Sequence, residues 1–225
     1  MPEVDLSAEL SHLAGDVCRR VKVLAHIDPE ALLFTLSRSR ALGEHGLYAR
    51  ICPLRPWNGN NEVTRRQRGR LEIWRLPRLQ HEGRDILYLI NLLVPRFFRL
   101  SFREKLHTLL HELYHISPSF DGSLRRFPGR CHAHGRSRRR YDADVAVLVD
   151  DYLGQNIDPA LFRVLEIEEE DWQKGTVRIV GLFSPLPRAK RVVSSWGVGQ
   201  GEEIGSEKLT IVPSPRRLSS QIFPP

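Results

Sequence analysis

The sequence has few cysteines and no long apolar segment. Its three cysteines, Cys18, Cys52 and Cys131, are too scattered for a disulfide framework, and no C-x-x-C pair offers thiolates to a zinc ion. The longest apolar run, 86–94, contains one asparagine and is only about half as long as a membrane-spanning helix. The N-terminal segment 1–5 is acidic, whereas a signal peptide begins with basic residues. We therefore expect a cytoplasmic protein with no membrane partner.

The charge of the chain is unbalanced in one place. Lys and Arg number 34, and Asp and Glu number 27, which gives a formal net charge of +7. Residues 124–140 contain seven arginines and no acidic residue, so this segment accounts for the whole excess. A local run of positive charge permits a polyanionic partner such as DNA or RNA. The arginines of this segment are Arg125, Arg126, Arg130, Arg136, Arg138, Arg139 and Arg140.

The hydrophobic pattern predicts an α+β fold with N-terminal helices, a short mixed sheet, a central helix and a following buried helix. Apolar residues recur every three or four positions over 6–24, as in an amphipathic helix, and Asp28-Pro29 is typical of a helix start. A nearly continuous apolar run is typical of a strand buried on both faces. The expected helices are 6–24, 28–42, 101–116, 142–153 and a short one from 158, and the expected strands are 47–54, 70–76, 86–94 and 176–183.

The C-terminal segment differs in composition from the rest of the chain. Residues 184–225 contain six of the 15 prolines, with glycine and serine between them. Such a composition is typical of a segment that cannot bury enough apolar surface to fold. We therefore expect one domain over 1–183 and a mostly disordered basic tail over 184–225.

His111, Glu112 and His115 form an H-E-x-x-H motif. Residues four apart on a helix lie on one face, so the two histidines can bind one metal ion through nitrogens at about 2.0–2.1 Å. A zinc ion would acidify a water molecule, and Glu112 lies near enough to accept its proton. The motif follows a capping box that begins at Ser101, which favours a metal site over a chance match. His107, one turn earlier, is expected to support the site rather than to bind the metal.

A catalytic zinc ion needs a third protein ligand and one open position. Asp121 has the spacing of the third ligand in H-E-x-x-H-x-x-G-x-x-H, but Pro118 replaces the glycine, and proline cannot adopt a positive φ. His132 and His134 lie in the loop that follows the motif, and on an extended segment they would point the same way. The remaining acidic candidates, for which solvated helix faces are the preferred interpretation, are Asp142, Asp144 and 166–171.

The run His111–Ile116, preceded by a strand and followed by His134-Gly135, resembles the zincin-type metallopeptidases. It is similar to the SprT-like group and to a phage and prokaryotic metallopeptidase family with H-E-L-x-H-I. The resemblance covers roughly residues 86–153 and implies a small zincin-like domain. It implies Zn²⁺ bound by His111, His115 and His134, with His132 as the alternative third ligand, and Glu112 as the catalytic base. We expect no SprT-type zinc ribbon, because no cysteine follows Cys131 in this sequence.

Two functions are therefore expected to compete. The first is a zinc-dependent peptidase that hydrolyses peptide bonds in protein or peptide substrates. The alternative is a nucleic-acid-associated, SprT-like protein. In that protein the arginine-rich segment 124–140 would bind DNA or RNA, and the metal site would be structural or would act on DNA-bound proteins.

Overall fold

The computed structural model describes residues 2–38, 47–67, 70–127, 134, 137–196 and 214–217. Within these residues the fold is mixed α+β, as predicted. The helices are α1 (Leu6–Arg20), α2 (Phe102–Tyr114), α3 (Arg138–Leu153), α4 (Arg163–Glu166) and α5 (Glu169–Lys174), and the 3₁₀ turns are η1 (Lys22–Leu24), η2 (Pro29–Ala31), η3 (Arg96–Arg99) and η4 (Pro159–Phe162). The strands are β1 (Glu3–Asp5), β2 (Leu32–Arg38), β3 (Ala49–Pro53), β4 (Glu62–Gln67), β5 (Arg70–Arg75), β6 (Leu79–His81), β7 (Arg84–Ile86), β8 (Tyr88–Val94), β9 (Arg178–Phe183), β10 (Lys190–Trp196) and β11 (Ser214–Arg217).

The sheet beneath the helices has the strand order β2-β8-β3. Strand β8 pairs parallel with β2 and antiparallel with β3, so the expected mixed sheet is confirmed. The apolar run of β8 is buried on both faces, also as predicted. Ile90 and Leu92 pack into the main core with the helices, while Leu89 packs into a smaller cluster on the opposite face. Because β8 is the central strand and both of its faces are covered by apolar residues, its sequence is apolar at nearly every position.

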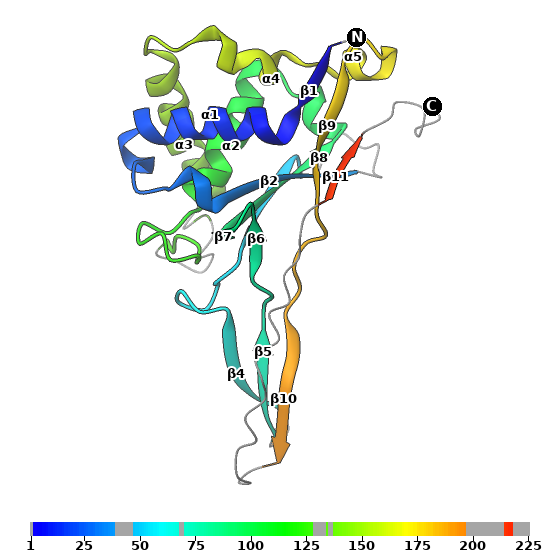
Figure 1. Cartoon of the computed structure of the whole chain (residues 1–225). Helices are drawn as coiled ribbons and strands as arrows, with labels where there is room; N and C mark the ends of the chain where they lie inside the picture. The colour runs from blue at the N-terminus through cyan, green and yellow to red at the C-terminus, as the bar shows by residue number, and fades with distance from the viewer. Residues whose placement is uncertain are drawn as a thin grey trace.

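Helix α1 covers one face of this sheet with the expected apolar stripe (Figure 1). Leu6, Leu10 and Leu13 are fully buried, and each lies three or four residues from the next. Asp5 caps the helix by accepting hydrogen bonds from the N–H groups of Ser7 and Ala8, both at 3.0 Å. Helix α2 lies on the same face, and the two helices therefore share one core.

Two buried polar contacts connect the helices to one another. The ammonium group of Lys105 on α2 donates to the carbonyl oxygens of Leu165 at 3.0 Å and Ile167 at 2.8 Å. These carbonyls lie at the end of α4, where no helical N–H follows to bond them. The hydroxyl of Tyr152 on α3 donates to Asp16 on α1 at 2.8 Å. Burial of these groups is tolerable because each has a partner.

The prediction of a second N-terminal helix over 28–42 is wrong. Asp28 caps only the 3₁₀ turn η2, and the chain then forms strand β2. The first five residues of β2 are buried, and the strand pairs along its full length with β8. Without β2, one edge of β8 would carry unpaired backbone groups inside the protein, so sheet pairing overrides the local helix signal. Residues 39–46 lie outside the described part of the chain.

A narrow three-stranded antiparallel arm with the order β10-β5-β4 extends away from the helices (Figure 1). Its strand β10 and the short strand β11 fall within 184–225, the segment expected to be disordered. Strand β10 pairs with β5 and β11 pairs with β9, so these residues form paired strands within that segment. Their pairing partners lie more than 30 residues away in sequence, and composition alone does not report such contacts.

The helix expected at 142–153 begins earlier, at Arg138, so the basic run 138–140 forms its first turn. Ser137 caps this helix by accepting a hydrogen bond from the N–H of Arg140 at 3.4 Å. Among the described helices, none is both long enough and apolar enough to cross a membrane.

Two glycine substitutions test this packing. A Cβ added at Gly181 would lie 2.7 Å from Leu36 Cδ1 and 2.9 Å from Ser7 Oγ, so Gly181→Ala should lower the free energy of unfolding by about 1–3 kcal/mol. Gly15 in α1 has no neighbour closer than 3.8 Å, so Gly15→Ala should raise it by about 0.5–1 kcal/mol. Urea unfolding measures both changes. Equal midpoints for the two variants would contradict the packing of β9 against α1 and β2.

Candidate metal centre

Helix α2 carries the H-E-x-x-H motif, and its predicted start is confirmed. Ser101 accepts a hydrogen bond from the N–H of Glu104, and the Glu104 carboxylate accepts one from the N–H of Ser101 at 2.8 Å. This capping box fixes the first turn. The helix ends at Tyr114 with His115 as its C-cap, directly before Ser117-Pro118. His111 and His115 therefore lie one turn apart at the end of the helix.

The nitrogen atoms of His111, His115 and His134 lie within 4.8 Å of one another, and this is the metal-ligating cluster found among the described residues. The Nε2 atom of His111 lies 3.2 Å from that of His115 and 3.4 Å from that of His134. Two nitrogens bound at about 2.05 Å to one tetrahedral ion are about 3.3 Å apart. Two of the three separations already have this value, so the three imidazoles are close enough to bind a metal ion.

The chain after α2 turns back towards the histidines through a short paired segment. Ile116 and Leu124 form an isolated antiparallel bridge, and the N–H of Arg125 donates to the carbonyl of His115 at 2.7 Å. Gly122 lies in this turn with a φ of +84°, which favours glycine. This paired segment reverses the chain after α2, and His134, farther along the chain, lies against His111 and His115. His132, the alternative third ligand, lies outside the described residues.

Asp142 and Tyr141, on the first turns of α3, hold the imidazole of His111. An Asp142 carboxylate oxygen lies 3.2 Å from His111 Nδ1, which leaves Nε2 free to face the metal. The Tyr141 hydroxyl donates to the carbonyl oxygen of His111 at 3.0 Å. His107 lies one turn before His111, and its Nε2 is 3.1 Å from the carbonyl oxygen of Asp142. His107 thus supports α3 and is not part of the cluster, as expected.

The ring of Tyr141 also forms one wall of the site. Its centroid lies 4.8 Å from the ring of His111, 4.9 Å from that of His115 and 5.0 Å from that of His134. The contact with His115 is stacked, with an angle of 22° between the planes. The Nδ1 atom of His115 is buried without a hydrogen-bond partner among the described residues, so ring packing orients this imidazole.

Burial keeps the imidazoles of His111 and His115 neutral. Loss of hydration lowers the pKa of His111 to about 4, although the Asp142 carboxylate acts in the opposite direction. Loss of hydration also lowers the pKa of His115 to about 3, helped by the nearby His111 and His134. A neutral imidazole has the free lone pair that metal binding needs. At neutral pH these two imidazoles are therefore in the form that binds a metal ion.

Glu112 lies on the sheet side of α2 and is 7% exposed. Burial raises the pKa of its carboxyl group to about 7, and a hydrogen bond from the backbone N–H of Ile51 on β3 acts in the opposite direction. It lines a small apolar space with Phe34 and Ala49. A carboxyl group in such surroundings exchanges a proton near neutral pH, which is the property of a general acid or base.

The acidic candidates for a third ligand have other roles in the structure. Asp121 accepts hydrogen bonds from the N–H of Ser123 at 3.0 Å and from the Ser123 hydroxyl at 2.6 Å, and these bonds stabilise the turn at 121–123. In the acidic run, Glu169 pairs with Arg99 at 2.6 Å and Glu170 with Lys174 at 2.6 Å. Asp144 is exposed on α3. None of these belongs to the histidine cluster.

The arginines of 124–140 differ in their surroundings in the described part of the chain. The guanidinium of Arg125 lies 4.5 Å from the ring centroid of Tyr114, so this side chain packs against the site. Arg138 approaches Asp142 at 3.7 Å. Nucleic-acid binding by this segment stays a prediction. The exposed members are Arg126, Arg138, Arg139 and Arg140, and Arg130 and Arg136 lie outside the described residues.

Three residues contribute to the site in roles that the sequence did not predict. Asp142 supports a ligand instead of being one, Tyr141 packs on all three rings, and Ile51 contributes only a backbone N–H. An acid on the first turn of the helix after His134 is a usable signal for Asp142, since metal-bound histidines usually donate their second nitrogen to a carboxylate. No sequence signal identifies a backbone N–H from a distant strand.

Comparison with models of known protein families, with curated proteins and with solved structures found no significant match.

Removal of the third histidine tests the cluster. The full-length protein should bind one equivalent of Co²⁺ with the visible spectrum of a tetrahedral site. His134→Ala should weaken that binding by more than tenfold, because one of three protein ligands is lost. His12→Ala, at an exposed histidine of α1, is the matched control and should bind like the unaltered protein. Unchanged Co²⁺ affinity in His134→Ala would contradict the proposed ligand set.

The role of Asp142 has its own test. Asp142→Asn keeps the size of the side chain and removes the charge beside His111 Nδ1, so Co²⁺ affinity should fall about 10- to 100-fold. Asp144→Asn removes the same charge from an exposed position of the same helix and should leave the affinity unchanged. Titration with Co²⁺ measures the affinity of both variants. Equal losses of affinity in the two variants would show a general charge effect and contradict the specific role of Asp142.

Proposed function

We propose that the chain is a zinc-dependent metallopeptidase that hydrolyses peptide bonds in protein or peptide substrates. The observation that carries this proposal is the convergence of three imidazoles at the end of α2, where the same helix turn carries the buried carboxyl group of Glu112. Three nitrogen ligands without a fourth protein ligand among the described residues fit a catalytic zinc ion, because such an ion keeps one position open. When bound, zinc supplies Lewis acidity, which polarises a carbonyl group and makes water more acidic.

Glu112 is the general base and then the general acid of the proposed reaction. Its carboxylate takes a proton from the attacking water as the new C–O bond forms. It delivers that proton to the amide nitrogen as the C–N bond breaks, so the amine leaves in neutral form. Glu112 is held by Ile51 on the sheet side of α2, next in sequence to His111. Tyr141 does not serve as a donor to the substrate, since its hydroxyl bonds the carbonyl of His111.

The edge strand β3 supports a peptide as the substrate class. Among the described strands, β3 pairs on one side only, with β8. The even-numbered residues of this segment hydrogen-bond to β8. The N–H of Leu93 donates to the carbonyl oxygen of Tyr48 at 2.9 Å, and the N–H of Leu54 donates to the carbonyl oxygen of Leu87 at 3.0 Å. The backbone groups of Ala49 and Ile51 therefore point to the other side. The N–H of Ile51 already donates to Glu112, and the other outward backbone groups of this edge can hydrogen-bond an extended peptide close to Glu112.

Replacement of the carboxyl group tests the proposed chemistry. Glu112→Gln should keep one equivalent of zinc, because the ligands are untouched, and should lose at least about 100-fold in the rate of hydrolysis of an unfolded protein substrate. Metal analysis and a gel-based cleavage assay measure the two properties separately.

The matched control is Glu104→Gln at the start of the same helix, where glutamine preserves the capping box. It should cleave at the rate of the unaltered protein. Treatment with a chelator should abolish cleavage, and added zinc should restore it. Cleavage that persists in Glu112→Gln would overturn the assignment, and so would a purified protein that takes up no metal.

A further inference from the structure

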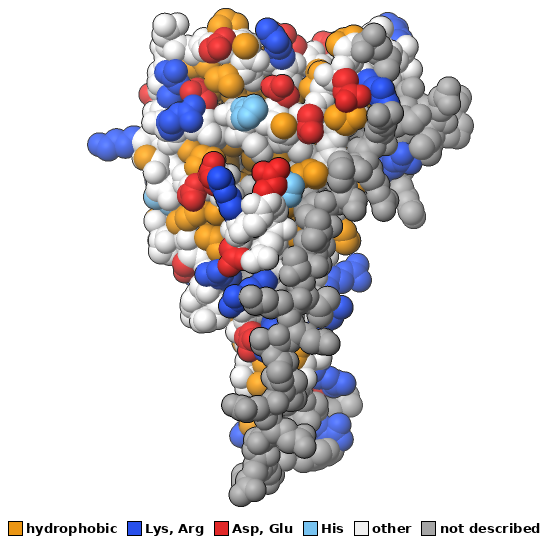
Figure 2. All heavy atoms as spheres, in the orientation of Figure 1, with side chains coloured by type: hydrophobic (Ala, Val, Ile, Leu, Met, Phe, Trp, Pro, Cys, Tyr) orange, Lys and Arg blue, Asp and Glu red, His pale blue; other side chains and the backbone are white. Residues whose placement is uncertain are grey.

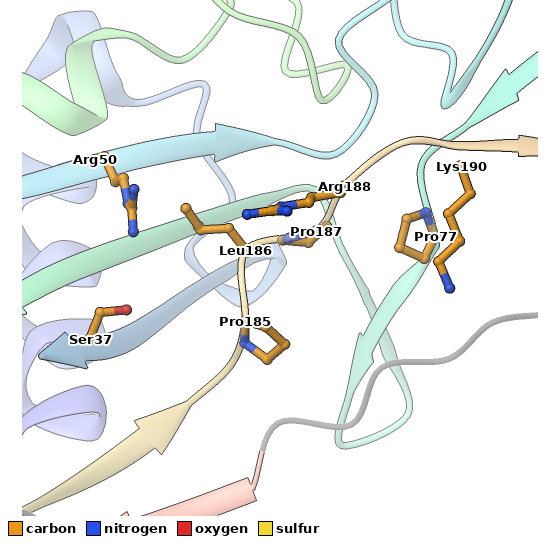
Figure 3. Close-up of a pocket in the computed structure, with 8 residues that line it drawn as sticks. All are labelled: Ser37, Arg50, Pro77, Pro185, Leu186, Pro187, Arg188 and Lys190. Atoms are coloured by element: carbon orange, nitrogen blue, oxygen red, sulfur yellow. The ribbon is translucent and has the colours of Figure 1, made fainter.

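A second polar site lies on the opposite face of the central sheet, away from the histidines. A pocket of about 480 Å³ opens where the arm joins the body, between the end of β2, strand β3 and the chain that leads into β10. Figure 3 shows that its polar side chains come from three separate segments. They are Ser37, Arg50, Arg188 and Lys190. Its volume is that of a pocket for a small organic ligand.

Arg50 is held in this pocket by a buried polar row that crosses the sheet. Its Nε donates to Asn91 at 3.4 Å, and the Asn91 amide donates to the hydroxyl of Thr35 at 3.0 Å. The three residues are in cross-strand register on β3, β8 and β2. Asn91 and Thr35 are fully buried. An apolar row would fill this space without hydrogen bonds, so the polar row has the specific effect of orienting the guanidinium.

The positive charges of the pocket lack acidic partners in the part of the chain that the structure describes. Within those residues no carboxylate lines the pocket, and neither Arg188 nor Lys190 forms an ion pair. Neighbouring cations of the arm differ, since Arg191 pairs with Glu72 at 3.0 Å and Arg75 pairs with Glu62. Figure 2 shows Lys and Arg side chains on the arm below the helices. Three cations around one cavity attract an anion, because a bound anion offsets their mutual repulsion.

The walls of the pocket are rigid. Pro77, Pro185 and Pro187 contribute to its lining, and Pro187 is buried. Proline fixes φ near −65° and lowers the entropy that a loop loses on binding a ligand. In Figure 3 the guanidinium of Arg188 extends towards Arg50, while Lys190 lies beside Pro77. The cations thus surround a preformed space with apolar surface between them.

We propose that this pocket binds a phosphate-bearing small molecule of nucleotide size. Arg50 and Arg188 bind the phosphate oxygens, because a guanidinium presents paired N–H donors that match two oxygens of one phosphate. Lys190 adds a further charge, and the proline walls contact the rest of the ligand. This site does not depend on the metal centre, and its ligand need not be a peptide.

The experiment uses isothermal titration of the full chain with three probes: inorganic pyrophosphate, ADP and adenosine. Pyrophosphate or ADP should bind saturably in the micromolar to millimolar range, and adenosine should not bind, because it lacks phosphate. Arg188→Gln and Arg50→Gln should each weaken binding about tenfold or more. Arg188→Gln is the decisive variant, since Arg188 is exposed and its replacement leaves the polar row of Asn91 intact.

The matched control is Arg66→Gln, an exposed arginine on β4 with the same change of charge. It should bind pyrophosphate or ADP like the unaltered protein. An equal loss in Arg66→Gln would show a diffuse electrostatic attraction and overturn the site. The proposal also fails if neither phosphate probe binds at 1 mM, or if only a single-stranded oligonucleotide binds, since a nucleic-acid backbone would then be the occupant.

Discussion

The packing of helix α2 between the central sheet and α3 is the constraint on which the rest of the site depends. One side of α2 buries Leu106, Leu110 and Leu113 in the main core, which fixes the rotation of the helix. With that rotation fixed, Glu112 can only face the sheet, where Ile51 bonds it, and His111 faces α3, where Asp142 bonds it. A rotation of α2 by one residue would exchange a leucine for a charged or polar side chain in the core. The cost of that exchange keeps the chemistry in place.

Contacts with the surrounding residues position the histidine cluster. Tyr141 packs against all three rings and bonds the backbone of α2, and the paired segment after His115 returns the chain towards α3. A site whose ligands are already close loses little entropy when it binds a metal. Burial that lowers the pKa values of His111 and His115 adds to this, since no proton has to leave before binding.

Strand β3 connects the two polar regions of the protein. Ile51 donates its backbone N–H to Glu112 on the helix side, and the preceding residue, Arg50, points to the pocket on the other face. The Arg50 side chain projects from one face of the sheet, whereas the N–H of Ile51 points outwards from the unpaired edge of β3, so one short strand serves both regions. The central strand β8 shows the same division, with Asn91 in the polar row and its neighbours Ile90 and Leu92 in the main core. The sheet therefore separates a metal site from a cationic pocket by the thickness of one layer.

The sequence by itself determined the features that depend on neighbours along the chain: the capping box at Ser101, the pairing of His111 with His115 at helical spacing, and the buried run of β8. Tertiary structure alone decided which distant residues complete them. It made 32–38 a strand instead of a helix, brought His134 to the pair on α2, and turned Asp142 from a ligand candidate into a support. It also placed Arg50, Arg188 and Lys190 around one pocket. Hydrophobic periodicity reports the local geometry of the chain. The pairing of strands and the position of a loop residue such as His134 depend on contacts between residues far apart in sequence, which no local pattern encodes.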